Sequence, residues 1–189
     1  MNHRKITIAT LAGVVGVLAA CQGVSALPTG EVQQSAAPAG DVLDVRAAMV
    51  EGVNPAALEI WDIGNSAMTD DGGLDPELMD AAAWARLHEA AQSLAIYSHR
   101  MAEAGTFRAS GPDLVGGEVP EGVAPREEIQ AKIDANPAGF RALSAEMGRQ
   151  AQAIAEAAAA KDLQKTGELV FAFDAVCQTC HEGYWYPSE

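Results

Sequence analysis

The sequence predicts an all-α fold, an antiparallel four-helix bundle, and two features of the chain carry this prediction. After residue 40 the 189-residue chain is rich in Ala, Leu, Glu and Gln and has few runs of β-branched residues, a composition that favours helices. In this part, apolar residues recur at helical spacing in four segments, which are separated by breaks containing Gly or Pro. Helices of this length, joined by loops and without a signal for strands, are typical of an antiparallel bundle.

The first 20 residues are predicted to be an export signal. The basic start MNHRK precedes the apolar run ITIATLAGVVGVLAA, which is too short to span a bilayer comfortably. The run ends in Leu18-Ala19-Ala20-Cys21, which resembles the lipobox of bacterial lipoproteins and implies cleavage before Cys21 and acylation of its thiol and new amino terminus. A competing cut follows Ala26, after the small residues of VSA. Either cut predicts a periplasmic protein, tethered to a membrane by lipid in the first case and soluble in the second.

Residues 21–40 are predicted to be a flexible tether, because they are small, polar and punctuated by Pro and Gly, and residues 41–189 are predicted to be the helical domain. The formal net charge is −14, and removal of residues 1–20 makes it about −16 because two basic residues and no acidic residue are lost. So acidic a protein is not expected to bind nucleic acid or to adhere to anionic lipid, and membrane contact would depend on the lipid anchor. A redox partner protein with a basic docking face would be attracted to it.

The first helix is predicted at residues 41–68. Its sequence contains Asn54-Pro55, which predicts a break or kink. Pro55 lacks an amide hydrogen, and its ring disfavours helical backbone angles at Asn54.

The second helix is predicted to have Asp75 as its N-cap and Pro76 as its first helical residue, and to end at Gly105. Its apolar positions recur at helical spacing and predict the face that packs into the core. These positions are Leu78, Ala82, Ala85, Leu87, Ala91, Leu94 and Met101.

The rest of the chain is predicted to contain a long loop and two more helical regions. Residues 105–124 are too rich in Gly and Pro for regular structure, and a loop of that length usually has a function or is mobile. The third helical region is predicted at residues 125–161, with an interruption at Asn136-Pro137. The fourth is predicted at residues 162–182 and carries the motif that determines the chemistry.

That motif is CQTCH, in which Cys177, Cys180 and His181 could hold zinc, carry out thiol chemistry or bind haem. A zinc site needs about four ligands, so His88 or His99 would have to complete it. Thioredoxin-like chemistry places the two cysteines at the start of a helix, whereas here the helix dipole near the helix end opposes thiolate formation. Covalent haem explains every feature, because two cysteines three residues apart on a helix lie near one face and can form thioethers with the vinyl groups. The sequence therefore predicts one covalent haem c, with His181 as the proximal iron ligand.

A haem motif near the end of the last of four helices resembles the class II c-type cytochromes, the cytochrome c-prime family, over roughly residues 41–186. The ending CQTCHEGYWYP also resembles a group of bacterial cytochromes of this class. They combine it with a first helix reading Met, five residues, Pro-Ala and then Trp, here MVEGVNPAALEIW from Met49 to Trp61. The resemblance implies that the first helix faces the distal side of the haem, with Met49 as the candidate sixth iron ligand. Trp185 departs from the family, since many cytochromes c-prime have a basic residue there.

The other candidate ligands are expected to have structural roles. Met49 itself has an alternative role as a core residue, as most helical methionines do. Met68 is expected to lie too far from the haem, and Met101 and Met147 are expected in the core. His88 and His99 are expected to be partly exposed helical residues. The aromatic residues expected to line the haem or the core are Trp61, Trp84, Phe140, Phe171 and Phe173, and those expected to cover the haem edge or close the bundle end are Tyr184, Trp185 and Tyr186.

These expectations favour a periplasmic cytochrome that carries single electrons through His/Met-coordinated haem, since a methionine ligand raises the haem potential. No nucleophile–base pair is visible, so catalysis is not expected. The first alternative is a five-coordinate haem that binds nitric oxide or carbon monoxide, as in the cytochrome c-prime family. The second is a lipoprotein subunit whose loop at residues 105–124 docks onto a larger complex. The family resemblance also implies that a homodimer can form.

Overall fold

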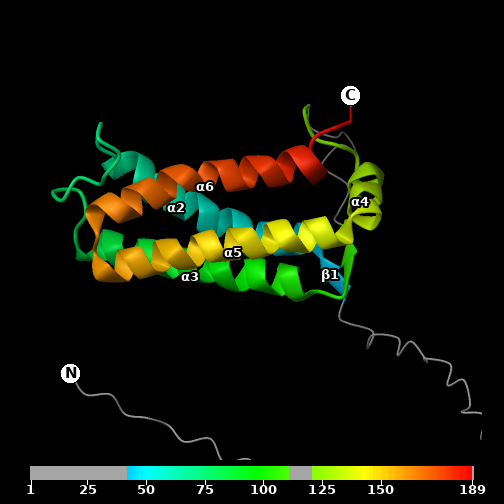
Figure 1. Cartoon of the computed structure of the whole chain (residues 1–189), viewed down its shortest axis with the longest axis horizontal. Coiled ribbons are helices and arrows are strands. Elements are labelled where there is room, and N and C mark those ends of the chain that lie inside the picture. Colours follow the sequence, from blue (N-terminus) through cyan, green and yellow to red (C-terminus); the bar gives the residue numbers. More distant parts are fainter. Residues whose placement is uncertain (1–41, 111–120, 189) are drawn as a thin grey trace, which may run out of the picture. The chain divides into compact units, whose positions relative to one another are not determined.

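Helices make up most of the described chain (Figure 1). The computed structural model describes residues 42–110 and 121–188, all within one compact unit, Ala36–Glu189. The predicted export signal, Cys21, the tether and the middle of the 105–124 loop lie outside the described residues. Across the two described stretches, no helix combines the length and apolarity that a membrane crossing requires.

Four helices pack in a closed cycle around the core. Helix α2 (Asn54–Ala67) packs against α3 (Ala81–Glu103), which packs extensively against α5 (Pro137–Ala160), and α5 packs against α6 (Leu163–Tyr184). Helix α6 contacts α2 in turn, which completes the cycle. Figure 1 shows α3 and α5 running side by side, with α6 and α2 alongside them. The helix α4 (Arg126–Ala135) lies at the end of α5 and contacts both α6 and α5.

The first helical region is continuous and contains a π turn in place of the predicted break. Helix α1 (Val45–Ala48) leads into the π-helical segment η1 (Met49–Val53), which leads into α2. The prediction that Asn54 leaves helical angles is wrong, because its φ and ψ are −62° and −48°. The wider turn accommodates the proline ring without ending the helix.

The predicted start of the second helix is wrong. The N-cap of α3 is Asp80, whose carboxylate accepts a hydrogen bond from the Ala83 amide at 2.8 Å. Asp75 instead stabilises a short turn, in which its side chain accepts from the Glu77 amide at 2.8 Å. Three residues of the predicted stripe are therefore exposed, namely Leu78, Ala82 and Ala85, whereas Leu87, Ala91, Leu94 and Met101 are buried as predicted.

Two short parallel strands were not predicted. Strand β1 (Val42–Asp44) pairs with β2 (Thr106–Arg108), and Leu43 lies opposite Phe107. The second strand lies inside the segment predicted to be irregular. Strands of three residues show no alternation in the sequence, and their pairing depends on helices that bring distant segments together.

The later helix boundaries confirm the prediction from local signals. Asn136 caps α5 by accepting a hydrogen bond from the Gly139 amide at 3.0 Å, and Pro137 is the first residue of that helix. Lys161 ends α5 in the left-handed conformation with a φ of 55°. Asp162 then caps α6 by accepting from the Lys165 amide at 3.0 Å. The two-residue connection makes α5 and α6 antiparallel.

Candidate functional site

The CQTCH motif occupies the last two turns of α6. Cys177 and Cys180 are partly buried against the core, and neither forms a disulfide. They are three positions apart on a regular helix, with two residues between them, so both thiols lie near the same face. His181 follows directly and is also partly buried. The structure thus places all three motif residues at one end of the described helices.

The environment of the motif opposes thiolate chemistry. Burial raises the pKa of the Cys177 thiol to about 12, with smaller contributions from Cys180 and Asp174, and burial raises the pKa of Cys180 to about 11. Both thiols are therefore protonated at neutral pH, unlike the activated thiols of redox enzymes. Burial also lowers the pKa of His181, which favours the neutral imidazole that can bind a metal.

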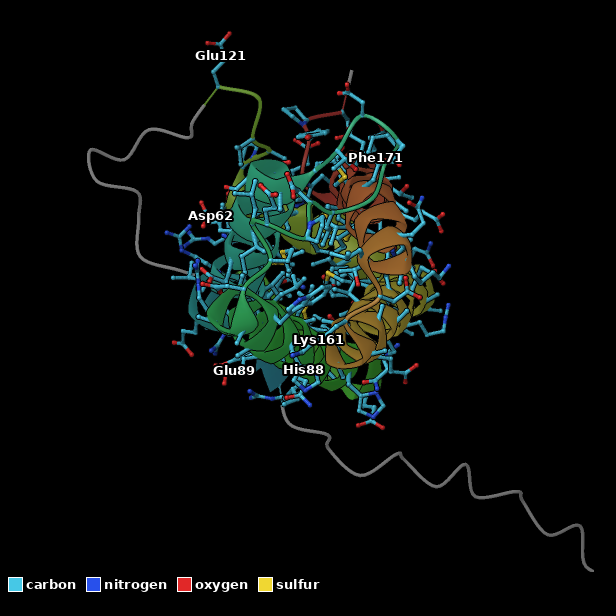
Figure 2. The ribbon with its side chains drawn as sticks, turned by 90° about the vertical axis from the view of Figure 1, so that its left-hand side faces the viewer. Asp62, His88, Glu89, Glu121, Lys161 and Phe171 are labelled. Atoms are coloured by element: carbon cyan, nitrogen blue, oxygen red, sulfur yellow. The ribbon has the colours of Figure 1, made fainter. Side chains whose placement is uncertain are left out.

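The described residues do not support a zinc site. Among residues 42–110 and 121–188, no group of three or more His, Cys, Asp or Glu side chains is arranged to hold a metal ion. The two histidines that might have completed such a site lie on α3 and have other neighbours. His88 Nδ1 lies 2.9 Å from the Ala155 carbonyl oxygen, and His99 Nε2 lies 3.1 Å from a carboxylate oxygen of Glu103. Figure 2, viewed from the end where α5 leads into α6, labels His88 on α3 and Lys161 in the connection between α5 and α6.

Three aromatic residues after the motif lie against the neighbouring elements. The Tyr184 hydroxyl donates to the Asn136 carbonyl at 2.9 Å, and its ring packs edge-on against Phe140 with a centroid distance of 5.1 Å. The rings of Trp185 and Tyr186 lie 6.3 and 6.0 Å from the His181 ring. Tyr184 thus packs against the start of α5, while the rings of Trp185 and Tyr186 lie beside the motif histidine; that the three residues cover a haem edge stays a prediction.

A polar clamp that the sequence analysis missed holds this C-terminal segment on α4. Glu128 accepts hydrogen bonds from the Ser188 amide at 2.7 Å and from the Ser188 hydroxyl at 2.8 Å, and its carboxylate pairs with Lys132 at 3.1 Å. The Lys132 ammonium also donates to the Tyr186 carbonyl. The four-residue spacing of Glu128 and Lys132 was a visible signal for an ion pair, but not for its contact with the distant C-terminus.

Met49 lies at the same end of the helices as the motif. Helix α2 runs antiparallel to α6, because Gly64 packs against Val170 while Trp61, one turn earlier, packs against Phe173, one turn later. Continuing this register brings the start of the first helical region toward the end of α6 (Figure 1). Met49 is partly buried against the core there.

Met68, Met101 and Met147 lie where the sequence predicts. Met68 pairs with Leu74 beyond the opposite end of α2, far along the helix from the motif. Met101 and Met147 are buried in the core. Among the methionines of the described residues, Met49 is therefore the one that lies at the motif end of the helices without being completely buried.

The aromatic predictions hold except for one residue. Trp84, Phe140 and Phe173 are buried, and Trp61 is partly buried. Phe171 was predicted to line the haem or core, and this is wrong because it is 78% exposed. Figure 2 shows it pointing outward from α6. Two residues along a helix are about 200° apart, so Phe171 and Phe173 cannot share a face.

An open cavity of about 430 Å³ lies near this end but does not include the motif. It is formed by β1 and α1 on one side and by the end of α3 on the other. Its polar lining includes Asp44, Glu51, Arg100 and Glu103. The cavity therefore contains none of the residues that the sequence assigns to haem.

Comparison with known proteins agrees with the chemistry of the motif. Residues 117–185 match the family model described as Cytochrome C′, a range that includes α4, α5 and α6 with Cys177, Cys180 and His181. Neither the comparison with curated proteins nor the comparison with solved structures found a match. The first helical region, with Met49, lies outside the matched range. Over the part that carries the motif, the chain is thus similar to the class II c-type cytochromes, which bind haem c.

Proposed function

We propose that this protein is an exported mono-haem c-type cytochrome that carries single electrons, folded as an antiparallel four-helix bundle. The observation that carries the proposal is the CQTCH motif at the end of α6, inside the range similar to Cytochrome C′. The closed cycle of α2, α3, α5 and α6 supports the bundle.

The motif residues fit covalent haem. Cys177 and Cys180 are free, protonated and on one face, so both can form thioethers with the haem vinyl groups. The neutral imidazole of His181 can bind iron on the proximal side. The bound haem would supply a one-electron redox centre, and the surrounding apolar residues would restrict water around it.

Met49 is proposed as the distal iron ligand. Its position at the motif end and its partial burial support this role, as does the resemblance of MVEGVNPAALEIW to first helices of this class. A thioether ligand opposite histidine raises the potential and leaves no open site for a gas molecule. Without that ligand the haem would be five-coordinate, and binding of nitric oxide or carbon monoxide would become the favoured function.

The predicted export signal and the acidic composition are consistent with a periplasmic protein. Cytochrome C′ proteins are typically periplasmic. We propose that lipidation of Cys21 tethers the domain to a membrane, with cleavage after Ala26 as the alternative. The net charge of −14 favours a redox partner with a basic face, and the rate of association would fall as salt rises.

Optical spectra of the exported chain, matured with haem, test this function. The expected spectrum is low-spin, shows the methionine-to-iron charge-transfer band and does not change with carbon monoxide. Met49→Ala should remove the band and permit the gas to bind, whereas Met68→Ala, at the other end of α2, should leave both unchanged. His181→Ala should abolish the normal haem spectrum. A high-spin wild-type spectrum that shifts with carbon monoxide would favour gas binding instead.

A further inference from the structure

The first helical region changes its hydrogen-bond pattern next to a proline. The Asn54 amide donates to the Met49 carbonyl, five residues earlier, where an α-helix would use the carbonyl four residues earlier. Pro55 follows and has no amide hydrogen to donate. In a regular α-helix its ring would also collide with the carbonyl of Glu51, and the wider π turn relieves that collision.

We propose that Pro55 sets the direction of Met49 by imposing this π turn, and is therefore a positioning residue for the distal ligand. The proposal rests on the function proposed above. Its first support is geometric. Met49 and Ile60 are eleven residues apart, close to three turns of an α-helix, so an uninterrupted helix would place them on one face. The additional residue of the π turn rotates Met49 by about 100°, onto the face of Trp61.

The burial of neighbouring residues shows the same rotation. Ala48, rather than Met49, lies on the same helix face as the buried Ile60 and is 9% exposed. Val50 takes the face of the exposed Asp62 and is 56% exposed, although it is apolar. In an uninterrupted helix Val50 would lie on the partly buried face of Trp61, and Ala48 would lie on the polar face of Glu59.

The face that Met49 gains is the one that meets α6. The Trp61 ring lies 5.5 Å from the Phe173 ring, and a Cβ placed on Gly64 would lie 2.5 Å from Val170 Cγ1. The opposite side of η1 meets α3, where Gly52 packs directly against the ring of Tyr97. The π turn therefore directs Met49 toward the helix that carries Cys177, Cys180 and His181.

The first test replaces Pro55 with alanine in the haem-loaded chain. Pro55→Ala restores the amide, and the helix is expected to return to the α form with Val50 in the place of Met49. The methionine-to-iron band should then be lost and carbon monoxide should bind. Pro137→Ala is the matched control, because Pro137 is the first residue of α5, where a missing amide has no consequence. An unchanged spectrum in Pro55→Ala would contradict the proposal.

A register rescue distinguishes rotation from general damage. In the triple variant Pro55→Ala/Met49→Val/Val50→Met, the methionine occupies the position that an uninterrupted helix directs toward α6. The low-spin band and the indifference to carbon monoxide should return. If the triple variant has the same spectrum as Pro55→Ala alone, the rotation account is wrong.

A readout that does not depend on the haem separates this proposal from the proposed function. A cysteine introduced by Val50→Cys should react rapidly with a maleimide when Pro55 is present, and several-fold more slowly when Pro55→Ala is added. Peptide masses identify which cysteine carries the label. Equal rates would overturn the role of Pro55 whatever binds the iron. A second outcome is that Pro55→Ala slows the maleimide labelling while the haem spectrum of Met49→Ala is unchanged. That outcome would refute Met49 as an iron ligand, but the effect of Pro55 on the helix register would stand.

Discussion

Two phenylalanines on α6 provide a matched test of the packing. Phe173 is 0% exposed and its ring contacts Trp61, whereas Phe171 is 78% exposed. Truncation of a buried phenylalanine to alanine removes its transfer free energy and leaves a cavity, at a cost of roughly 3–5 kcal/mol. Only about a fifth of the Phe171 surface is covered, so its truncation should cost about 0.5 kcal/mol or less. Both residues lie in the same helix, so the change in helix propensity is the same for both variants.

Urea unfolding of the haem-loaded chain, followed by far-ultraviolet circular dichroism, measures this difference. With a slope of about 1–3 kcal/mol per molar urea, a loss of about 3 kcal/mol lowers the midpoint by roughly 1–3 M for Phe173→Ala. The midpoint for Phe171→Ala should stay close to that of the wild type. Equal midpoints for the two variants, or a larger loss for Phe171→Ala, would refute the packing described for α6.

Three other sites give independent predictions. Lys161→Gly should stabilise the protein by about 1 kcal/mol in thermal melts, because glycine adopts the left-handed conformation at the end of α5 without steric cost; a lower melting temperature would contradict this. Thr166→Val should also stabilise by about 1 kcal/mol, since the buried Thr166 hydroxyl has no hydrogen-bond partner among the described residues, and a loss of stability would reveal a partner. Hydrogen bonds from Ser188 and from Lys132 hold the pKa of Glu128 below its usual value. The contribution of this carboxylate to folding stability is therefore fully present above the unfolded pKa of about 4.3, and it is lost as pH falls through the lower folded pKa. Fluorescence of Trp185, the tryptophan of the C-terminal segment, should report the loss of the clamp, and Glu128→Gln should lack the clamp already at neutral pH. Identical acid titrations for the wild type and Glu128→Gln would count against the clamp.

Local sequence signals predicted the later helices well because the chain itself carries their caps. Asn136 and Asp162 each precede a helix and accept the hydrogen bond expected of an N-cap. The start of α3 could not be assigned in the same way, because Asp75 and Asp80 both have the chemistry of a cap. Leu74, just before Asp75, and Met79, between the two aspartates, are both buried, which favours the later start, and that burial is a tertiary effect.

The motif residues of the candidate site could be identified from the sequence, whereas their surroundings could not. Cys177, Cys180 and His181 are adjacent in sequence, so their spacing alone predicts haem attachment. The rings of Phe107, Phe140 and Tyr184 meet only because the chain folds, with centroid distances of 4.7 and 5.1 Å between successive rings. The π turn escaped prediction for another reason, since a proline predicts that a helix is disturbed without indicating whether it breaks or widens.

The proposed function depends above all on one covalent haem being attached to Cys177 and Cys180. The most direct measurement is the intact mass of the exported, purified chain under denaturing conditions, beside that of the Cys177→Ser/Cys180→Ser variant. The wild-type chain is expected to retain the mass of one haem after denaturation, and the double variant is expected to retain none. Peptide masses should place the haem on the segment that contains both cysteines. A wild-type chain that has the mass of the polypeptide alone after expression with haem-maturation machinery would contradict the account.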